Sequence, residues 1–312
     1  MRSSRRAAMV VAAILAGLLA VSPAHANAYT LDGPNYGWRS VDGGHEYSSP
    51  RGTFSVTGFR DTPSRAFSAA HRSAGGGRGA LGYPTTRQIP ERNEVYLAEG
   101  YVFDVDGAYQ VFERGVVYGS RTVDNQGFFD LSTTAVVRGG QSPFRAVHDS
   151  TGGGSGSLSY PIGDEVRQAG NYWYQVFLLG VIYVSPSGAY PVYDNWGGFN
   201  YTARGGGSGP LGYPTARHVQ QGSHYAYQTF ERGILYAVPP CYECDASPIG
   251  IEVRGGFIDA HAARGGGTGS LGYPRWNETY NSSTRTWTQI FERGRIEIGP
   301  GGTRYVMGKF WG

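Results

Sequence analysis

Short segments that mix apolar and polar residues and end in glycine recur along this chain with the same internal spacing. Each begins with glutamine, has phenylalanine two positions later, and reaches glycine after two further residues. Residues two apart share one face of a strand, and glycine supplies the left-handed backbone that a tight hairpin turn needs. The pattern predicts four hairpins, centred on residues 110–115, 175–180, 228–233 and 289–294.

A second recurring segment precedes each hairpin: three glycines, then leucine, then a Tyr-Pro pair. The glycine runs begin at Gly75, Gly152, Gly205 and Gly265, and the leucines are Leu81, Leu158, Leu211 and Leu271. A third segment, clearest at Pro186, Gly188 and Val192, follows each hairpin, and its spacing is also found near the N-terminus at Pro50, Gly52 and Val56. Self-similarity of this kind indicates a repeat architecture, here of four full units and one late half unit.

Each triple glycine is preceded by a short stretch with an aromatic ring four residues before the first glycine. In three units this ring is a histidine that follows a phenylalanine by four positions, and in the third unit it is Tyr201. A four-residue spacing places two rings on one face of a helical turn, and glycine ends a helix readily. We therefore expect each unit to be a short helix followed by three or four strands.

Composition agrees with an all-β fold that carries short helices. Glycine accounts for 50 of 312 residues and aromatic residues for 14%. Abundant glycine for turns, together with abundant Tyr, Phe and Val, is typical of many short strands joined by tight turns.

The N-terminus predicts export. Arg2, Arg5 and Arg6 precede an apolar run over residues 7–21, and the small-residue site Ala24-His25-Ala26 follows it. This is the pattern of a signal peptide over residues 1–26, and it leaves open general or twin-arginine export. A run of this length is too short to span a membrane. We expect a secreted protein with no integral membrane segment.

The charge of the exported part argues against a nucleic-acid partner. After residue 26 the chain holds 24 basic and 24 acidic side chains, and Lys309 is the only lysine. Nucleic-acid binding needs a basic face, and a P-loop needs a lysine on the phosphates.

The motifs G-G-x-x-G-x-L-G-Y-P, F-E-R-G and S-P-x-G together resemble the LGFP repeat of secreted actinobacterial proteins. The resemblance covers residues 36–312 and implies association with the arabinogalactan-peptidoglycan wall and a propeller-like disc. This chain has Tyr where the family name has Phe, Ser159 for a glycine, and Leu178-Leu179 for Glu-Arg. We expect one repeat domain over 27–312, with a half unit at 36–59 and units at about 65–138, 142–193, 197–255 and 256–312.

Two sets of side chains are candidates for ligand binding. Tryptophans vary between units, so they are less tied to the fold than the repeated phenylalanines, and flat aromatic faces stack on sugar rings. The Glu-Arg pairs of the hairpin turns could contact glycan hydroxyl groups, although solvated surface pairs explain them as well. The candidates are Trp173, Trp196, Trp276, Trp287, Glu113, Arg114, Glu231, Arg232, Glu292 and Arg293.

Other repeated or reactive residues have structural interpretations. The glutamines fit buried amides that satisfy backbone groups of the glycine loops, and the histidines fit ring packing better than a metal site, because Tyr201 takes the same place. Cys241 and Cys244, in a Pro-flanked insertion of an exported chain, could form a local disulfide. No cofactor site is expected.

No catalytic motif stands out, and the resemblance to LGFP repeats implies a wall partner. We therefore expect a secreted, non-catalytic protein that binds cell-wall arabinogalactan or peptidoglycan. One alternative is a protein-binding or enzyme-inhibitory propeller that uses its long insertions. Another is a cell-wall hydrolase whose carboxylates meet in space without leaving a motif.

Overall fold

We analysed a computed structural model of the chain. It describes residues 36–41, 44–57, 66–96, 102–124, 130–139, 142–194, 198–222, 224–239 and 249–309. The predicted signal peptide at 1–26, Trp196, and the Cys241–Cys244 pair lie outside these residues.

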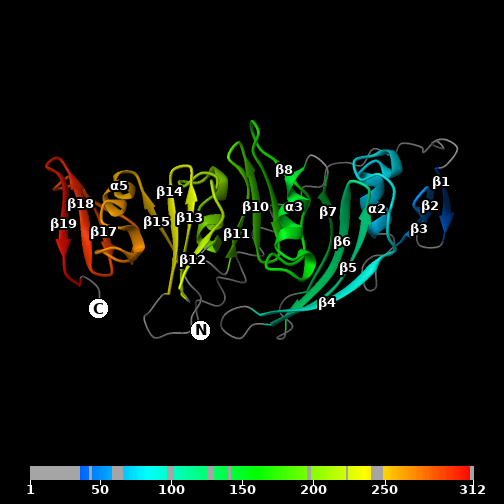
Figure 1. The fold of residues 1–312 in the computed structure, drawn as a ribbon, viewed down its shortest axis with the longest axis horizontal. Coiled ribbons are helices and arrows are strands. Elements are labelled where there is room, and N and C mark those ends of the chain that lie inside the picture. The colour runs from blue at the N-terminus through cyan, green and yellow to red at the C-terminus, as the bar shows by residue number, and fades with distance from the viewer. Residues whose placement is uncertain are drawn as a thin grey trace. The chain divides into compact units, whose positions relative to one another are not determined.

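The described strands form five small antiparallel sheets, and within each sheet neighbouring strands are consecutive in sequence (Figure 1). The first sheet contains β1 (Gly37–Val41), β2 (Gly44–Ser49) and β3 (Gly52–Val56). The second contains β4 (Ile89–Tyr96), β5 (Val102–Phe112), β6 (Gly115–Asp124) and β7 (Asp130–Arg138). The third contains β8 (Val166–Arg167), β9 (Trp173–Phe177), β10 (Gly180–Ser185) and β11 (Gly188–Tyr193).

The fourth sheet contains β12 (Val219–Gln221), β13 (Tyr225–Phe230), β14 (Gly233–Val238) and β15 (Ile249–Arg254). The fifth contains β16 (Thr279–Asn281), β17 (Thr286–Phe291), β18 (Gly294–Gly299) and β19 (Gly302–Met307). The predicted hairpins are the β5–β6, β9–β10, β13–β14 and β17–β18 connections, each turning between a phenylalanine and a glycine. The prediction of a mainly β fold is confirmed, whereas closure into a disc stays a prediction.

Short helices occupy the predicted positions before the glycine runs. They are α2 (Ala66–Ser73), α3 (Pro143–Ser150), α4 (Gly198–Ala203) and α5 (Gly256–Ala262). Each is followed by a single 3₁₀ turn, η1 (Gly76–Arg78), η3 (Gly153–Ser155), η5 (Gly206–Ser208) and η6 (Gly266–Thr268). The glycine before each turn has a left-handed backbone, with φ of 86° at Gly265 and 100° at Gly152. Only glycine adopts this conformation without steric cost, which explains why the helices end there.

The chain forms two compact regions. Among the described residues, one comprises 36–96, Val102–Val166 and Gln175–Leu178, and the other comprises Arg167–Tyr174 and 179–309. Within the described residues, no helix is long and apolar enough to cross a membrane.

The repeated glutamines are buried and join each sheet to the strand that precedes it in the chain. Gln289 Nε2 donates to the carbonyl of Glu252 on β15 at 2.7 Å and to that of Trp276 at 3.1 Å. Gln228 makes the same two contacts with Pro191 and Ala216. The other two are Gln110, on Ser55 and Thr86, and Gln175, on Val136 and Gly163. The glutamines are structural as predicted, but their acceptors lie outside the glycine loops.

The ring at the end of each helix is also held inside the protein. His261 Nε2 lies 2.9 Å from the carbonyl oxygen of Gly272, and the Tyr201 hydroxyl donates to that of Gly212 at 2.7 Å. His71 and His148 make the corresponding contacts with Gly82 and Ser159. A carbonyl only accepts, so Nε2 of each histidine carries the proton. The expectation of ring packing is confirmed.

Burial makes these histidines a source of acid sensitivity. Desolvation lowers the pKa of His71 from its usual value near 6.5 to about 4, and it also lowers the pKa of His148 and His261. Between these values the unfolded chain binds a proton that the folded chain does not, so stability falls as pH falls.

Lowering the pH from 7 to 5 is expected to reduce the free energy of unfolding by about 2 kcal/mol through His71 alone. Urea denaturation across this range measures the loss. The His71→Tyr variant, which copies the arrangement at Tyr201, should show a shallower pH dependence. Identical profiles for the two proteins would contradict this role for His71.

In each of the first four sheets, a tyrosine on an inner strand (β2, β6, β10 or β14) packs against the helix and loop that follow the sheet in the chain. Tyr236 on β14 contacts Tyr273 edge to face, with ring centroids 6.1 Å apart, and His261 at 5.6 Å. Tyr183 makes the same contacts with Tyr213 and Tyr201. The remaining pairs are Tyr47 with Tyr83 and His71, and Tyr118 with Tyr160 and His148. We call this arrangement the tyrosine contact.

Candidate ligand-binding site

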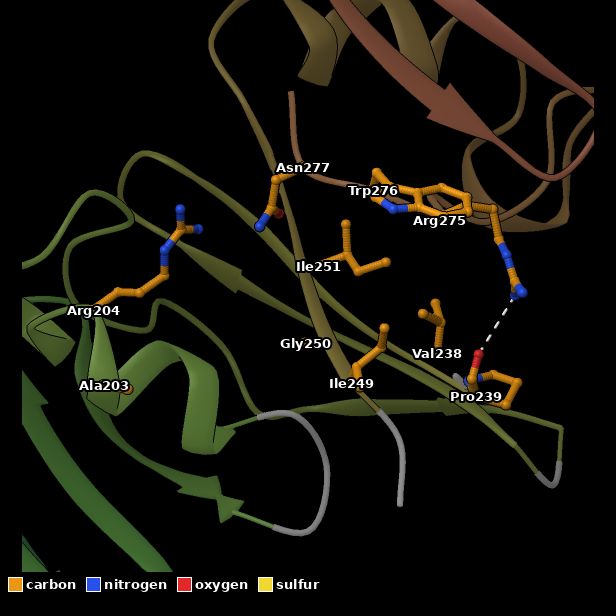
Figure 2. Close-up of a pocket in the computed structure, with 10 residues that line it drawn as sticks. All are labelled: Ala203, Arg204, Val238, Pro239, Ile249, Gly250, Ile251, Arg275, Trp276 and Asn277. Atoms are coloured by element: carbon orange, nitrogen blue, oxygen red, sulfur yellow. Dashed lines mark hydrogen bonds between the residues drawn. The ribbon is translucent and has the colours of Figure 1, made fainter. Parts of the chain in front are cut away.

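A pocket of about 490 Å³ opens in the second compact region (Figure 2). Its walls come from the end of α4, the end of β14, the start of β15, and the segment that follows Pro274. The lining residues are Ala203, Arg204, Val238, Pro239, Ile249, Gly250, Ile251, Arg275, Trp276 and Asn277. The size is within the range of small-molecule sites in proteins.

Trp276 provides the aromatic wall of this pocket. Its side chain is 51% exposed, while its backbone carbonyl is fixed by Gln289. The corresponding carbonyls in the other units belong to Thr86, Gly163 and Ala216. These residues are small, and among them the Thr86 side chain also accepts a hydrogen bond, from the backbone N–H of Val111 at 3.1 Å. At Trp276 the bond to Gln289 uses the backbone carbonyl and leaves the indole unengaged by it.

Aliphatic side chains from β14 and β15 form the opposite wall. Val238 and Ile251 are buried, and Ile249 is exposed at the start of β15. Figure 2 shows Trp276 facing these side chains, with Arg204 and Asn277 toward one end and Arg275 at the other. The pocket is thus an apolar slot with polar groups at its ends, an arrangement that binds ligands having both apolar and hydrogen-bonding faces.

The end at Arg204 is held by a buried carboxylate. Glu252 is 2% exposed, and its Oε1 lies 2.9 Å from Arg204 Nη1 while its Oε2 lies 3.3 Å from Arg254 Nε. Arg254 also pairs with Glu278. Two acids and two bases compensate one another, as buried charges require. The arrangement fixes the guanidinium of Arg204 while leaving its side chain 41% exposed.

Asn277 and Arg275 are positioned by backbone contacts. The Asn277 Oδ1 atom accepts a hydrogen bond of 2.8 Å from the backbone N–H of Glu252, and Arg275 Nη1 donates to the carbonyl of Pro239 at 3.4 Å. These two hydrogen bonds hold the side chains on either side of Trp276 in the sequence.

The two other predicted tryptophans that the structure describes, Trp173 and Trp287, do not line this pocket. Trp287 on β17 is 45% exposed and packs beside the exposed Tyr280, with ring centroids 4.8 Å apart. Trp173 is partly buried, with the guanidinium of Arg167 5.3 Å from its ring centroid. Of the three candidate tryptophans that the structure describes, Trp276 is the one that lines the pocket.

The Glu-Arg pairs hold the glycine loops. Glu292 Oε2 accepts from the backbone N–H of Tyr273 at 3.3 Å, and Arg293 donates to the carbonyls of Gly269 and Ser270. The other two pairs make matching bonds, Glu113 with Tyr83, Arg114 with Gly79 and Ala80, Glu231 with Tyr213, and Arg232 with Gly209 and Pro210. These bonds give the pairs a structural role, and ligand binding by them stays a prediction.

The same bonds explain two differences between the second glycine-rich segment of this chain and the other three. A Cβ atom at Gly272 would lie 2.5 Å from Glu292 Oε2, so a side chain there would displace the carboxylate that accepts from the Tyr273 N–H. Ser159 occupies the equivalent position with a left-handed φ of 59°. It is tolerated because Leu178-Leu179 replaces the Glu-Arg pair in that unit. The two substitutions therefore belong together.

Carboxylates with shifted pKa values do not form a pair at the pocket. Burial raises the pKa of Asp194 to about 6, and it also raises the pKa of Glu165, which accepts bonds from Ser142 and the backbone of Arg138. Neither lines the pocket. Within the described part of the chain, no group of three His, Cys, Asp or Glu residues is arranged to hold a metal ion.

Sequence reasoning identified Trp276 but missed Arg204, Asn277 and the aliphatic wall. A signal for the pocket was available: the position two residues after the Tyr-Pro pair is small in three units and tryptophan in the fourth. Nothing in the sequence indicated that Arg204 lines the same pocket as Trp276, because the two residues are distant in the chain. No protein-family model matches the chain, and no curated protein matches it.

Proposed function

We propose that this protein is a secreted, non-catalytic module that binds a cell-wall glycan, arabinogalactan or peptidoglycan, and that Trp276 forms its best-defined sugar site. The resemblance to LGFP repeats and the predicted signal peptide support the location and the wall partner. The finer architecture that accompanies the proposal is an array of four full units and one half unit, arranged as a propeller-like disc.

The observation that carries the proposal is the exposed indole across from an aliphatic wall in a pocket with polar ends. A sugar ring has apolar C–H faces and hydroxyl groups at its edge. The C–H faces suit the slot between Trp276 and Ile251, while the hydroxyl groups suit Arg204 and Asn277. The site needs no ionised ligand, because Glu252 already balances Arg204.

A pull-down with the insoluble arabinogalactan-peptidoglycan complex tests the function. The chain from residue 27 is incubated with the complex and, as control, with cellulose, and both bound protein and released sugar are measured. The proposal predicts binding to the wall complex, little binding to cellulose, and no sugar release. Release of sugar would replace it with a hydrolase, and absence of binding would favour a protein partner.

Trp276→Ala is expected to weaken binding of soluble wall oligosaccharides by at least about tenfold, because the stacking surface is lost. Stability should hardly change, since the bond from Gln289 uses the backbone carbonyl of Trp276 and not its exposed indole. Isothermal titration calorimetry measures the affinity. Trp287→Ala, an exposed tryptophan outside the pocket, serves as the matched control and should bind like the unmodified protein at this site.

A further inference from the structure

One register position distinguishes the last sheet from the four before it. Three residues after the hairpin glycine, the first four sheets carry the tyrosines of the tyrosine contact, whereas the last carries Glu297. The cross-strand neighbour changes as well. Tyr236 pairs with Ile251 on β15, while Glu297 pairs with Arg304 on β19.

The tyrosine at this position lies in the buried cluster between each sheet and the helix and glycine loop that follow it. Tyr236, Ile251 and Val253 of the fourth sheet share one buried cluster with Phe257 and Leu271 of the following unit. Tyr47 and Val56 of the first sheet share another with Phe67, Leu81 and Tyr83. In both clusters, the apolar face of one sheet packs against apolar residues of the helix and loop that follow it in the chain.

The corresponding face of the last sheet carries three charged side chains, of which Arg304 is exposed and Arg295 and Glu297 are partly buried. Glu297 Oε1 lies 2.7 Å from Arg295 Nε, and its Oε2 lies 3.7 Å from Arg304 Nη1. Side-chain exposure is 33% for Arg295, 19% for Glu297 and 74% for Arg304. Among the described residues, no helix and glycine loop pack on this face in the way that α5 and η6 pack on the fourth sheet.

We propose that this face of the last sheet, formed by Arg295, Glu297 and Arg304, is a polar cap that rejects a further unit of the same type. Docking a helix and glycine loop there would bury three charges without supplying a polar partner, and buried ion pairs cost more in desolvation than they return. Terminal units of repeat proteins need a polar outer face for solubility. The cap also keeps the equivalent segment of a second copy of this chain from docking.

Moving the cap to an internal position tests the proposal. The double variant Tyr236→Glu, Ile251→Arg places the same ion pair on the fourth sheet, and hydrogen exchange of the full chain measures the result. We expect amide protection of residues 256–307 to fall by about a hundredfold or more, while residues 66–96 keep theirs. Tyr236→Phe is the control and should retain protection. Unchanged protection in the double variant would overturn the proposal.

The reverse experiment adds a unit to the end of the chain. Gly308 follows β19 as Gly255 follows β15, so a second copy of residues 256–309 can be joined directly after Gly308. When the unit is added to the unchanged face, the backbone amides of its helix should exchange without protection. With Arg295→Ile, Glu297→Tyr and Arg304→Ile, which copy Ile234, Tyr236 and Ile251, it should become as protected as α5. Two outcomes would contradict the cap. One is protection of the added helix on the unchanged face, and the other is no protection of it on either face while α5 itself stays protected.

Discussion

The Gly269→Ala variant should lose about 4 kcal/mol or more of unfolding free energy, enough to disrupt the last sheet and its helix. Gly269 ends the glycine loop after α5, and its backbone has ordinary extended angles. The difficulty is space: an added Cβ would lie 1.8 Å from the carbonyl oxygen of Arg264 and 2.6 Å from the Gly265 Cα. Both neighbours are backbone atoms, so relief requires the loop to open.

Opening the loop would also break the bonds that hold it. Arg293 donates to the carbonyl of Gly269, and the Ser270 N–H donates to that of Arg264 at 2.9 Å. Thermal and urea unfolding measure the loss. Gly301→Ala, in the turn between β18 and β19, is the control, because nothing lies within 4 Å of the added atom there. Similar stability of the two variants would show that the loop is more adaptable than this packing indicates.

The Gln289→Glu variant is expected to lose about 3 kcal/mol or more of stability near neutral pH. The glutamine donates two hydrogen bonds from one buried amide to the carbonyls of Glu252 and Trp276. An ionised carboxylate has no proton to donate and would face two carbonyl oxygens within the protein. Both carbonyls would lose a partner, and a buried charge would be left uncompensated.

Urea denaturation compares this variant with Gln220→Glu, which makes the same chemical change at an exposed site. The control should differ from the unmodified protein by less than about 0.5 kcal/mol. If Gln289→Glu were equally mild, the glutamine bonds would not be what joins the fourth and fifth sheets. Carbohydrate binding would be a useful second readout, because the carbonyl of Trp276 depends on the same bond.

The local elements were predictable because their signals are local. A Gln-x-Phe segment ending in glycine specifies a hairpin within six residues, and a ring four residues before glycine specifies the helix end. The replacement of histidine by Tyr201 was sufficient to predict packing, and Tyr201 does bond the same carbonyl as the histidines do. In each case the residues that decide the structure are adjacent in the chain.

The contacts between successive sheets could not be predicted in the same way. Gln110 reaches a carbonyl 55 residues earlier, and Gln289 one 37 residues earlier. A repeated glutamine predicts burial, but it does not say which backbone group accepts. The same limit applies to the pocket, since Arg204 and Trp276 line it together only because α4 packs beside β15. Tertiary packing, rather than local preference, supplies this information.

The measurement that tests the central claim most directly is a pair of adsorption isotherms on insoluble arabinogalactan-peptidoglycan, one for the unmodified chain from residue 27 and one for Trp276→Ala. The account predicts saturable binding of the unmodified chain, a clearly weaker isotherm for the variant, and no soluble sugar in either sample. Equal isotherms would contradict a sugar site at Trp276, and no adsorption of either protein would contradict wall-glycan binding altogether.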